Sequence, residues 1–513
     1  MADDKGKSAP GALESLKYKS GEEASNDVRA MQTEMLVSKS EELAIKQAQK
    51  LIKKYRGMAV EADLQLRLAE LYMRRAKSER FFELNRESEF AVKLAPQRVK
   101  SASSRTMIVK AVDIYDQIER RFKYFEKIDV VIFNNGFARQ QLGQEKTAEK
   151  LYWRVIKNHN YSMLVPDSHL AIGEMAFRQK RFKDALLHFE AIKKYPQSRV
   201  YPYGLYKAAW TQYNLQRTEV AMKELESVVE FGKRVEEQQL DARLDLRKEA
   251  LSDMALFYGE VYKPKDAYKY FSRHAKSEEI GDLLMKVSRI YARHGKFGEK
   301  DIVLRTFVDE NPRDSLIPEI YDQLVWNYED MKSRPQVVSQ LEDFRRLCAT
   351  NSRWAKGQKG EKAVEQIQGC VRKLQASAIK LAQKWLNLWE KNSSYPEFAD
   401  SAERAYQIYL ADNNDLEKAN KARFAYAQLM FQRQKFSPAS IEYEKVGRTT
   451  AEPQLGHESR YAAILSLEKS IKNNKWTNAE EERFKSLVQL YVTHHPQGKF
   501  RLDVEFKVGL IAY

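Results

Sequence analysis

The stretch Gly-Glu-Met-Ala-Phe-Arg-Gln-Lys-Arg-Phe-Lys-Asp-Ala-Leu-Leu-His-Phe, residues 173–189, decides the fold of this chain. It places a small residue, Gly173, twelve positions before Ala185, and a large ring, Phe189, four positions further on. Two antiparallel helices joined by a tight turn can approach closely only where both carry small side chains. The large residue one helical turn on then fills the space behind them. The same interval recurs at Gly136–Ala148–Tyr152, Ala209–Ala221–Leu225, Ala255–Ala267–Phe271 and Ala427–Ala439–Tyr443, with a looser copy at Ser288–Lys300–Leu304.

The recurrence of this interval predicts a repeated helix pair. Ala148, Ala185 and Ala221 are 37 and 36 residues apart, and Ala267 follows after 46. Helix-pair repeats of about 34 residues have the tetratricopeptide (TPR) period. We therefore expect an all-α fold, a right-handed superhelical TPR-like solenoid of about ten to eleven helix pairs, with strand content near zero.

The composition agrees with long, solvent-exposed helices. The chain has 513 residues, of which 20 are glycine and 13 are proline, and 31% are charged. A solenoid can exceed the usual size of a single core, because each repeat buries surface only against its neighbours. We expect a disordered segment over 1–27, a TPR-like array over 28–315 with an inserted loop at 90–104, irregular helical repeats over 316–412, and TPR-like repeats over 413–513.

The end of the chain follows the register of the repeats. Pro496 precedes Tyr513 by 17 positions, as Pro196 precedes Tyr213. Residue 513 is therefore expected to end the first (A) helix of a pair whose second (B) helix is missing. A solenoid normally finishes with a polar cap, so we expect this chain to be the N-terminal part of a longer protein.

The net charge of +16 leaves two interpretations open. An acidic partner, such as a protein face or anionic lipid, would complement it, or the lysines are spread over an ordinary solvated solenoid. Nucleic acid is not expected, because no long basic run and no known reader motif occurs. No stretch of 18 apolar residues and no signal-peptide core is found, so no membrane span is expected, while peripheral membrane association stays open.

Two cysteines, Cys348 and Cys370, are predicted on consecutive helices that are joined by a loop around residues 357–360. A helical hairpin could bring them together as a disulfide, which would fit an oxidising compartment. Alternatively, they are two buried thiols that act as small hydrophobic side chains.

Residues 30–513 resemble the tetratricopeptide-repeat superfamily in their small-residue and alanine positions, although the tryptophan usual early in the A-helix is mostly missing. A narrower likeness rests on Lys-Lys-Tyr-Pro-Gln-Ser (193–198), Asp-Glu-Asn-Pro-Arg-Asp-Ser (309–315) and His-His-Pro-Gln-Gly (494–498). Similar junctions mark bacterial cell-envelope repeat proteins, such as the outer-membrane assembly lipoprotein and the Tol–Pal coordinator, and more loosely gliding-motility TPR proteins. The resemblance implies a scaffold in the periplasm or cell envelope, with the cytoplasm as the alternative location.

No catalytic or metal-binding motif is found in the sequence. HExxH, GxxxxGK[ST], GxGxxG and GxSxG are absent, and the eight histidines are dispersed. Nothing assembles a nucleophile, a base and an oxyanion site. We therefore expect a non-catalytic protein that uses no cofactor and no metal.

Repeat geometry singles out two candidate surfaces. In this fold the A-helices line the concave face, and positions three before, one after and four after the small anchor point into the groove. Aromatic rings, which dominate interface hot spots, occupy these positions in three consecutive repeats; alternatively, they pack between neighbouring A-helices. The candidate partner-binding residues are Phe133, Phe137, Phe177, Tyr203, Tyr206, Trp210, Tyr213 and Asn214. A second, acidic face is expected from Glu319, Asp322, Trp326, Glu329 and Asp330.

These observations predict a non-catalytic scaffold that binds partner proteins or peptide segments, acidic ones included, in a bacterial envelope assembly. Two alternatives stay open. The chain could be the superhelical part of a peptidoglycan-processing enzyme whose catalysis lies beyond residue 513, or a cytosolic TPR adaptor.

Overall fold

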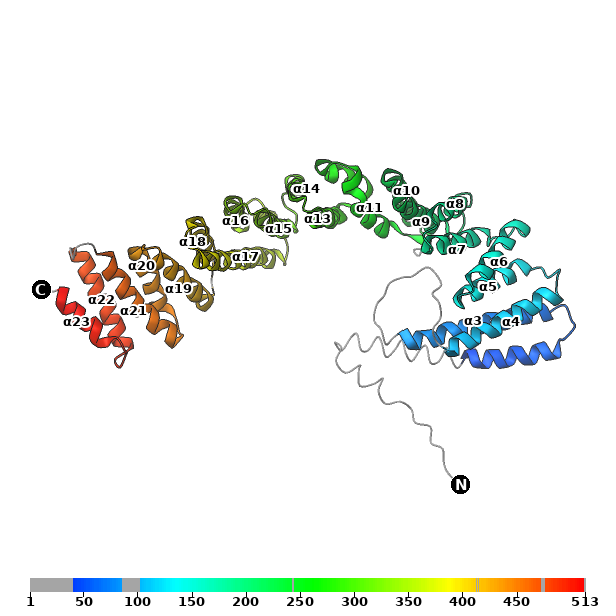
Figure 1. Ribbon diagram of the computed structural model, residues 1–513, viewed down its shortest axis with the longest axis horizontal. Coiled ribbons are helices and arrows are strands. Elements are labelled where there is room, and N and C mark those ends of the chain that lie inside the picture. Colours follow the sequence, from blue (N-terminus) through cyan, green and yellow to red (C-terminus); the bar gives the residue numbers. More distant parts are fainter. Residues whose placement is uncertain are drawn as a thin grey trace, which may run out of the picture. The chain divides into compact units, whose positions relative to one another are not determined.

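The computed structural model describes residues 40–84, 102–241, 244–411, 413, 415–471 and 476–511 (Figure 1). Within these ranges the regular secondary structure is entirely helical, which confirms the all-α fold class. The segment predicted to be disordered, 1–27, and most of the loop predicted at 90–104 lie outside the described residues. The end of that predicted loop is helical instead, because α4 already begins at Ala102.

The chain forms two compact units, residues 1–254 and 255–513. In the first unit a helix over 40–54 precedes a series of antiparallel pairs. The regions predicted to begin at 316 and 413 both lie inside the second unit and stay predictions. The helices of the first unit are α3 (Glu61–Leu84), α4 (Ala102–Arg121), α5 (Ile128–Gln141), α6 (Glu145–Asn158), α7 (Val165–Arg178), α8 (Phe182–Ile192), α9 (Tyr201–Asn214), α10 (Thr218–Glu237) and the start of α11 (Arg247–Val261).

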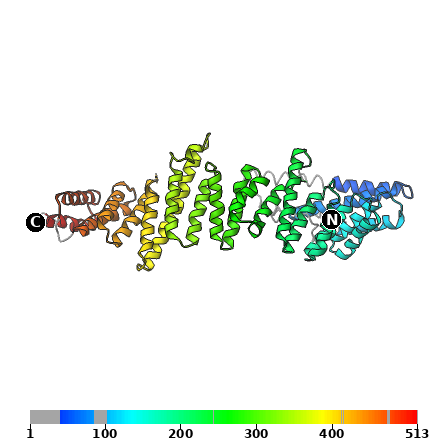
Figure 2. The ribbon, with the colours of Figure 1, turned by 90° about the horizontal axis from the view of Figure 1, so that it is seen from above.

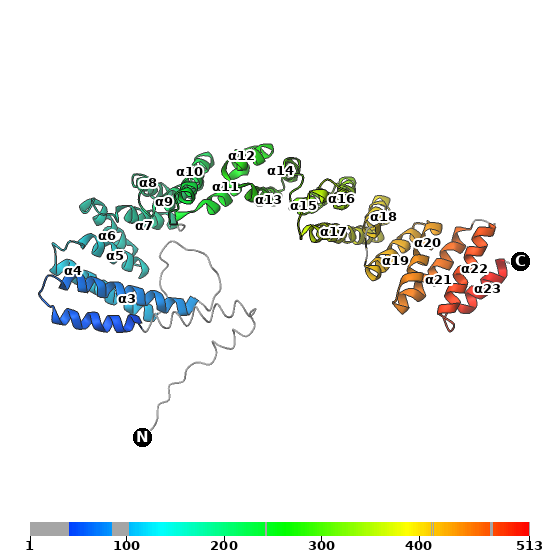
Figure 3. The same ribbon diagram turned by 180° about the vertical axis from the view of Figure 1, so that it is seen from behind.

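The second unit continues the same pairing. Figures 1 and 3 show its helices following one another side by side in chain order, and Figure 2 shows α13 to α18 side-on, in green to yellow. Its elements are the end of α11, a 3-10 turn (Pro264–Asp266), α12 (Ala267–His274), α13 (Ser277–Arg293), α14 (Phe297–Glu310), α15 (Ile317–Asp330), α16 (Arg334–Cys348), a second 3-10 turn (Ala355–Gly357), α17 (Ala363–Lys391), α18 (Pro396–Ala411), α19 (Leu416–Gln432), α20 (Phe436–Thr449), α21 (Pro453–Ser470), α22 (Asn478–His494) and α23 (Arg501–Ile511).

The small-residue interval determines how closely the two helices of a pair approach. A methyl group built on Gly173 would lie 2.6 Å from the Phe189 ring, and one built on Gly136 would lie 3.0 Å from the Tyr152 ring. Ala185, the partner anchor of Gly173, is 0% exposed. The ring therefore fills the space that the missing side chain leaves, as the interval predicts.

The turn inside a pair uses one left-handed residue at a repeated position. It lies two residues after the end of the A-helix, as Lys180 (φ 60°) after α7, Gln216 (φ 61°) after α9 and Gly143 (φ 81°) after α5. Such a residue lets the next backbone N–H groups satisfy the last carbonyls of the helix. After α7, the N–H of Arg181 donates to the carbonyl of Ala176 at 2.9 Å, so that the B-helix can start at once and run back.

Candidate functional site

The aromatic side chains predicted to bind a partner lie on three consecutive A-helices of the first unit, and we call them the aromatic set. All seven rings are partly buried. Asn214 ends α9, is exposed, and donates from its side-chain amide to the carbonyl of Trp210 at 2.7 Å. The aromatic set consists of Phe133 and Phe137 on α5, Phe177 on α7, and Tyr203, Tyr206, Trp210 and Tyr213 on α9.

Two members of the aromatic set pack within their own helix pair. The ring centroid of Phe133 lies 5.4 Å from that of Tyr152 on α6. The ring of Phe177 meets that of Phe182 on α8 edge-on, with centroids 5.3 Å apart. These rings therefore give part of their surface to the core and keep only part of it for a partner.

Tyr206 and Trp210 are held by one carboxylate of the next A-helix. The Tyr206 hydroxyl donates to Oδ2 of Asp253 at 2.6 Å, and the Trp210 Nε1–H donates to the same oxygen at 2.8 Å. Hydrogen bonds to a charged acceptor contribute about 1.5–3 kcal/mol each. Asp253 lies on α11, so it fixes both rings of α9 against the neighbouring repeat.

The polar ends of these two rings are thus satisfied inside the chain. Burial, and then the hydrogen bond to Asp253, raise the pKa of Tyr206, so its hydroxyl stays a donor at neutral pH. The ring of Tyr213 lies edge-on to that of Trp210, with centroids 5.9 Å apart. Tyr206 and Trp210 can therefore contact a partner through their ring carbons, and their polar atoms are already paired.

The acidic face of α15 contacts the long helix α17 of the same chain. The Lys373 ammonium lies 2.6 Å from a carboxylate oxygen of Glu319, and the Lys384 ammonium lies 2.6 Å from one of Glu329. The Glu329 side chain is only 8% exposed, whereas that of Lys384 is 49% exposed. Two ion pairs therefore join the ends of this helix contact.

Polar contacts also fill the middle of the α15–α17 contact. The Ser377 hydroxyl accepts a hydrogen bond from Trp326 Nε1 at 3.2 Å and donates one to Asp322. The Lys380 ammonium lies 4.6 Å from the centroid of the Trp326 ring. Of the predicted acidic face, Asp330 at the end of α15 stays exposed. Most of this face thus contacts α17, and its use as a partner-binding surface stays a prediction.

Cys348 and Cys370 are joined by a disulfide, with their Cα atoms 5.5 Å apart. Cys348 ends α16, and Cys370 lies in the N-terminal part of α17. Of the two alternatives left open by the sequence, the structure contains the disulfide. The loop between them is anchored by Trp354, which is 1% exposed and donates from Nε1 to the carbonyl of Asp314 at 2.8 Å.

Two histidines meet between α7 and α8. The Nδ1 atoms of His169 and His188 are 3.0 Å apart, so one ring must donate while the other accepts. Burial, followed by the proximity of His188, lowers the pKa of His169 to about 4, and burial also lowers the pKa of His188. Asp184, Arg181 and Lys194 are the charged groups that act on this pair. The pair is stable only when at least one ring is neutral.

The described ranges contain no cluster of His, Cys, Asp or Glu that could hold a metal ion.

None of the helices in the described part of the chain is both long enough and apolar enough to span a membrane.

Asp253 is the residue of this candidate site that the sequence did not reveal. It lies two positions before the small anchor Ala255, and no equivalent residue recurs at that position in the other repeats. The sequence could have predicted the contact between α15 and α17, because one face of α17 carries a polar row at helical spacing: Lys373, Ser377, Lys380 and Lys384.

Comparison with known proteins gives no family. No protein-family model matches the chain, and no curated protein matches its sequence. The chain is similar to a chain in a solved structure described as "Structure of Naa15/Naa10 bound to HypK-THB". That likeness has a TM-score of 0.26 and 12% sequence identity, over 98% of this chain and 90% of the other. At so low a TM-score it supports no inference, and the fold rests on the helix pairs described above.

Proposed function

We propose that this chain is a non-catalytic scaffold that binds a segment of a partner protein along the aromatic set of α5, α7 and α9. The observation that carries the proposal is the hydrogen bonding of Tyr206 and Trp210 to Asp253. Partly exposed rings whose polar ends are already paired can bury apolar partner surface without leaving a polar group unsatisfied. Their fixed orientation also lowers the ordering cost of binding.

The partner chemistry follows from what the rings leave exposed. A few residues carry most of the binding energy at a protein interface, and tyrosine and tryptophan are enriched among them where they are well packed and fully desolvated. The expected partner segment therefore places leucine, methionine, phenylalanine or proline side chains against the ring carbons of Trp210 and Tyr213.

The proposal includes a location in a bacterial envelope assembly. It is supported by the resemblance of the junctions 193–198, 309–315 and 494–498 to those of envelope repeat proteins. The disulfide between α16 and α17 also supports it, because disulfides persist mainly in oxidising compartments.

Site-specific photocrosslinking in the native host tests this function. A benzophenone side chain is placed at Tyr213 in the aromatic set, and in a second strain at Leu187, which is 72% exposed on the B-helix α8. Because both positions are accessible, the comparison separates the aromatic set from general surface exposure.

We expect a discrete crosslinked protein from position 213 that is absent from position 187. The crosslink should disappear when Trp210→Ala is added in the same chain. Equal crosslinking from both positions, or a crosslink at 213 that survives Trp210→Ala in a folded protein, would contradict the proposal.

A further inference from the structure

Strongly exposed apolar side chains occur in the junctions of the first unit that lead from a B-helix to the next A-helix. Tyr124 is 100% exposed, Met163 91%, Tyr161 71% and Met58 56%. In the described turns inside the pairs α5–α6, α7–α8 and α9–α10, no large hydrophobic side chain is exposed. The two ends of the helix pairs therefore differ in character. The junctions are residues 55–60, 122–127, 159–164 and 193–200.

The four junctions lie along one edge of the first unit. Because the two helices of each pair are antiparallel, every B-to-A junction lies at the same end of the pairs. One hydrophobic cluster joins Ile128, Leu164 and Tyr195, which stand in or directly after three successive junctions. The first junction is held to the second by an ion pair, in which Arg121 lies 2.8 Å from Glu61. We call this row of four junctions the junction edge.

The junction edge is also cationic. Together with the ends of the preceding helices, the stretches 53–60, 120–127, 157–164 and 193–200 contain eleven basic residues and one acidic residue. Four of the basic residues pair with carboxylates: Arg121, Lys127, Lys193 and Arg199. Four lysines are exposed and form no ion pair within the described ranges: Lys53, Lys123, Lys157 and Lys194. The balance of unpaired charge at this edge is positive.

Exposed rings and methionines among unpaired lysines match the surface of an anionic membrane. In the interface of a bilayer, aromatic rings lie at the level of the headgroups, and lysine side chains reach outward to anionic lipid. The cores of protein interfaces, in contrast, are depleted in lysine. Single-stranded nucleic acid stacks its bases on rings, which Met58 and Met163 do not supply. The chemistry of the junction edge therefore favours lipid.

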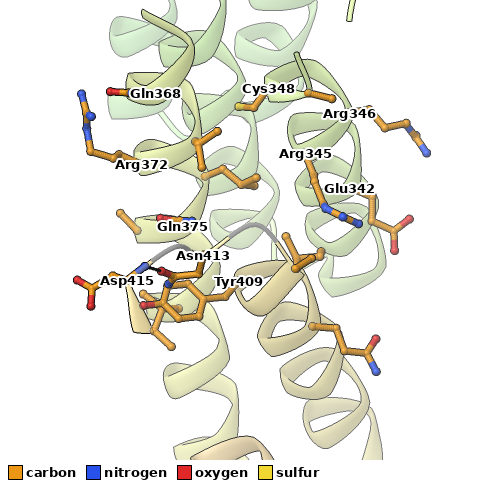
Figure 4. A pocket seen from close by; sticks show the side chains of 18 of the residues that line it. Glu342, Arg345, Arg346, Cys348, Gln368, Arg372, Gln375, Tyr409, Asn413 and Asp415 are labelled. Atoms are coloured by element: carbon orange, nitrogen blue, oxygen red, sulfur yellow. Dashed lines mark hydrogen bonds between the residues drawn. The ribbon is translucent and has the colours of Figure 1, made fainter. Parts of the chain in front are cut away.

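The hollow between α16, α17 and the end of α18, in the second unit, offers no comparable surface. Figure 4 shows its lining, which includes Glu342 and Arg346 of α16. The apolar residues Leu374 and Ile408 that line it are only 1% and 4% exposed, so a ligand could reach little of them. The apolar side chains of the junction edge, by contrast, are open to solvent.

We propose that the junction edge binds the surface of an anionic lipid bilayer. The rings of Tyr124 and Tyr161 and the side chain of Met163 enter the headgroup region. The unpaired lysines, Lys123 and Lys194 among them, face the lipid phosphates. Such a contact holds the scaffold at a membrane as a peripheral protein, because apolar burial and attraction to anionic lipid act together.

Co-sedimentation of the whole chain with lipid vesicles tests the charge at the junction edge. One vesicle consists of phosphatidylcholine alone, and the other of equimolar phosphatidylcholine and phosphatidylglycerol. The charge variant is Lys123→Glu/Lys194→Glu. Its matched control is Lys146→Glu/Lys183→Glu, which reverses two exposed lysines in the first turns of α6 and α8, at the opposite end of the pairs.

We expect binding to the anionic vesicles that weakens as salt is added, and no binding to phosphatidylcholine alone. Lys123→Glu/Lys194→Glu should weaken it at least about 30-fold, because each lysine near an anionic surface contributes about fivefold and each glutamate adds repulsion. The control should change it by less than about threefold, since charges beyond about 10 Å are largely screened. No binding to anionic vesicles, equal binding to both vesicles, or equal weakening by both variants would overturn the proposal.

A second pair of variants tests the apolar contact. Tyr124→Ser/Met163→Ser should weaken binding to the anionic vesicles about tenfold, because two apolar side chains no longer enter the interface. Leu187→Ser removes a side chain that is 72% exposed on α8, away from the junctions, and should change binding by less than about twofold. Helicity should be unchanged in both, since these side chains are open to solvent. Weakening by Leu187→Ser to the same extent would count against the junction edge.

Other occupants of the junction edge give different results. Tight binding of a short oligo-dT that is lost in Lys123→Glu/Lys194→Glu would assign the edge to nucleic acid. A dimer in analytical ultracentrifugation that dissociates in Tyr124→Ser/Met163→Ser would assign it to a second copy of the chain. Either result would overturn the lipid proposal. The inference does not depend on the aromatic set, so Trp210→Ala should bind the vesicles as tightly as the unaltered chain.

Discussion

The substitution Gly173→Ala probes the packing that defines the repeat. The added methyl carbon would lie 2.6 Å from Cε1 of Phe189 and 2.9 Å from its Cδ1. Carbon atoms pack best about 3.5–4.0 Å apart, so the ring would have to move by about 1 Å. Phe189, Ala185 and Ile192 are all 0% exposed, which leaves no open space into which the ring can shift.

Two opposing terms set the size of the effect. Overpacking a filled core costs about 1–3 kcal/mol, while replacing a helical glycine by alanine gains about 1 kcal/mol. We expect Gly173→Ala to lose about 1–2 kcal/mol of local stability, since the ring contact is severe. Gly369→Ala in α17 is the control, because its methyl group would meet only Arg372 Nη2 at 3.8 Å. That variant should gain about 0.5–1 kcal/mol.

Hydrogen exchange followed by mass spectrometry measures both effects where they occur. A loss of about 1–2 kcal/mol corresponds to amide exchange about 5–30 times faster in peptides from α7 and α8. Peptides from α17 should exchange more slowly in Gly369→Ala, and total helicity should be unchanged in both. If Gly173→Ala leaves α7 and α8 equally protected or better protected, the account of the small-residue interval is wrong.

Three further outcomes are expected. The folded pKa of His169 (about 4) is below its ordinary value of 6.5, so the unfolded state binds more protons and stability is lost as pH falls from about 6.5 towards 4. Urea titrations should show the free energy of unfolding falling by about 2 kcal/mol between about pH 7.5 and pH 5. In the double variant His169→Gln/His188→Gln the free energy of unfolding should depend less on pH. Lys384→Glu should lower the free energy of unfolding by about 1–3 kcal/mol, because it leaves the nearly buried Glu329 carboxylate unpaired and beside a like charge. Adding Glu329→Lys should recover part of this loss in the same titration. No recovery would argue against the ion pair between α15 and α17. Protein purified without reductant should show no reactive thiol after denaturation, and two reactive thiols would rule out the disulfide between α16 and α17.

The pairing of helices could be predicted because it depends on residues close together in the sequence. Gly173, Ala185 and Phe189 lie within one hairpin, whose geometry is fixed by helix length and a tight turn. The same local rule places Gly136 against Tyr152. The aromatic set followed from the same register, since each ring stands at a fixed distance from its small anchor.

Contacts between repeats could not be predicted in the same way. Trp210 and Asp253 are 43 residues apart, and Trp326 and Ser377 are 51 apart. No repeat rule relates these positions, because the helices between them vary in length and α17 alone has 29 residues. The charge of Glu329 also predicted the wrong exposure, because an acidic residue is expected at the surface whereas this side chain is only 8% exposed. A charged residue whose counter-ion lies on another helix is indistinguishable from a solvated one until the helices are placed.

The most direct test of the central claim is the affinity of the crosslinked partner for two variants of Trp210. Trp210→Phe keeps an aromatic ring but removes the pyrrole part of the indole and the N–H that donates to Asp253, so the dissociation constant should rise by about three- to tenfold, less than in Trp210→Ala. Trp210→Ala removes the ring and should weaken binding by about 2 kcal/mol, or about 30-fold, with helicity intact. If Trp210→Ala binds the partner as tightly as the unaltered chain, per folded molecule, the aromatic set is not the binding site.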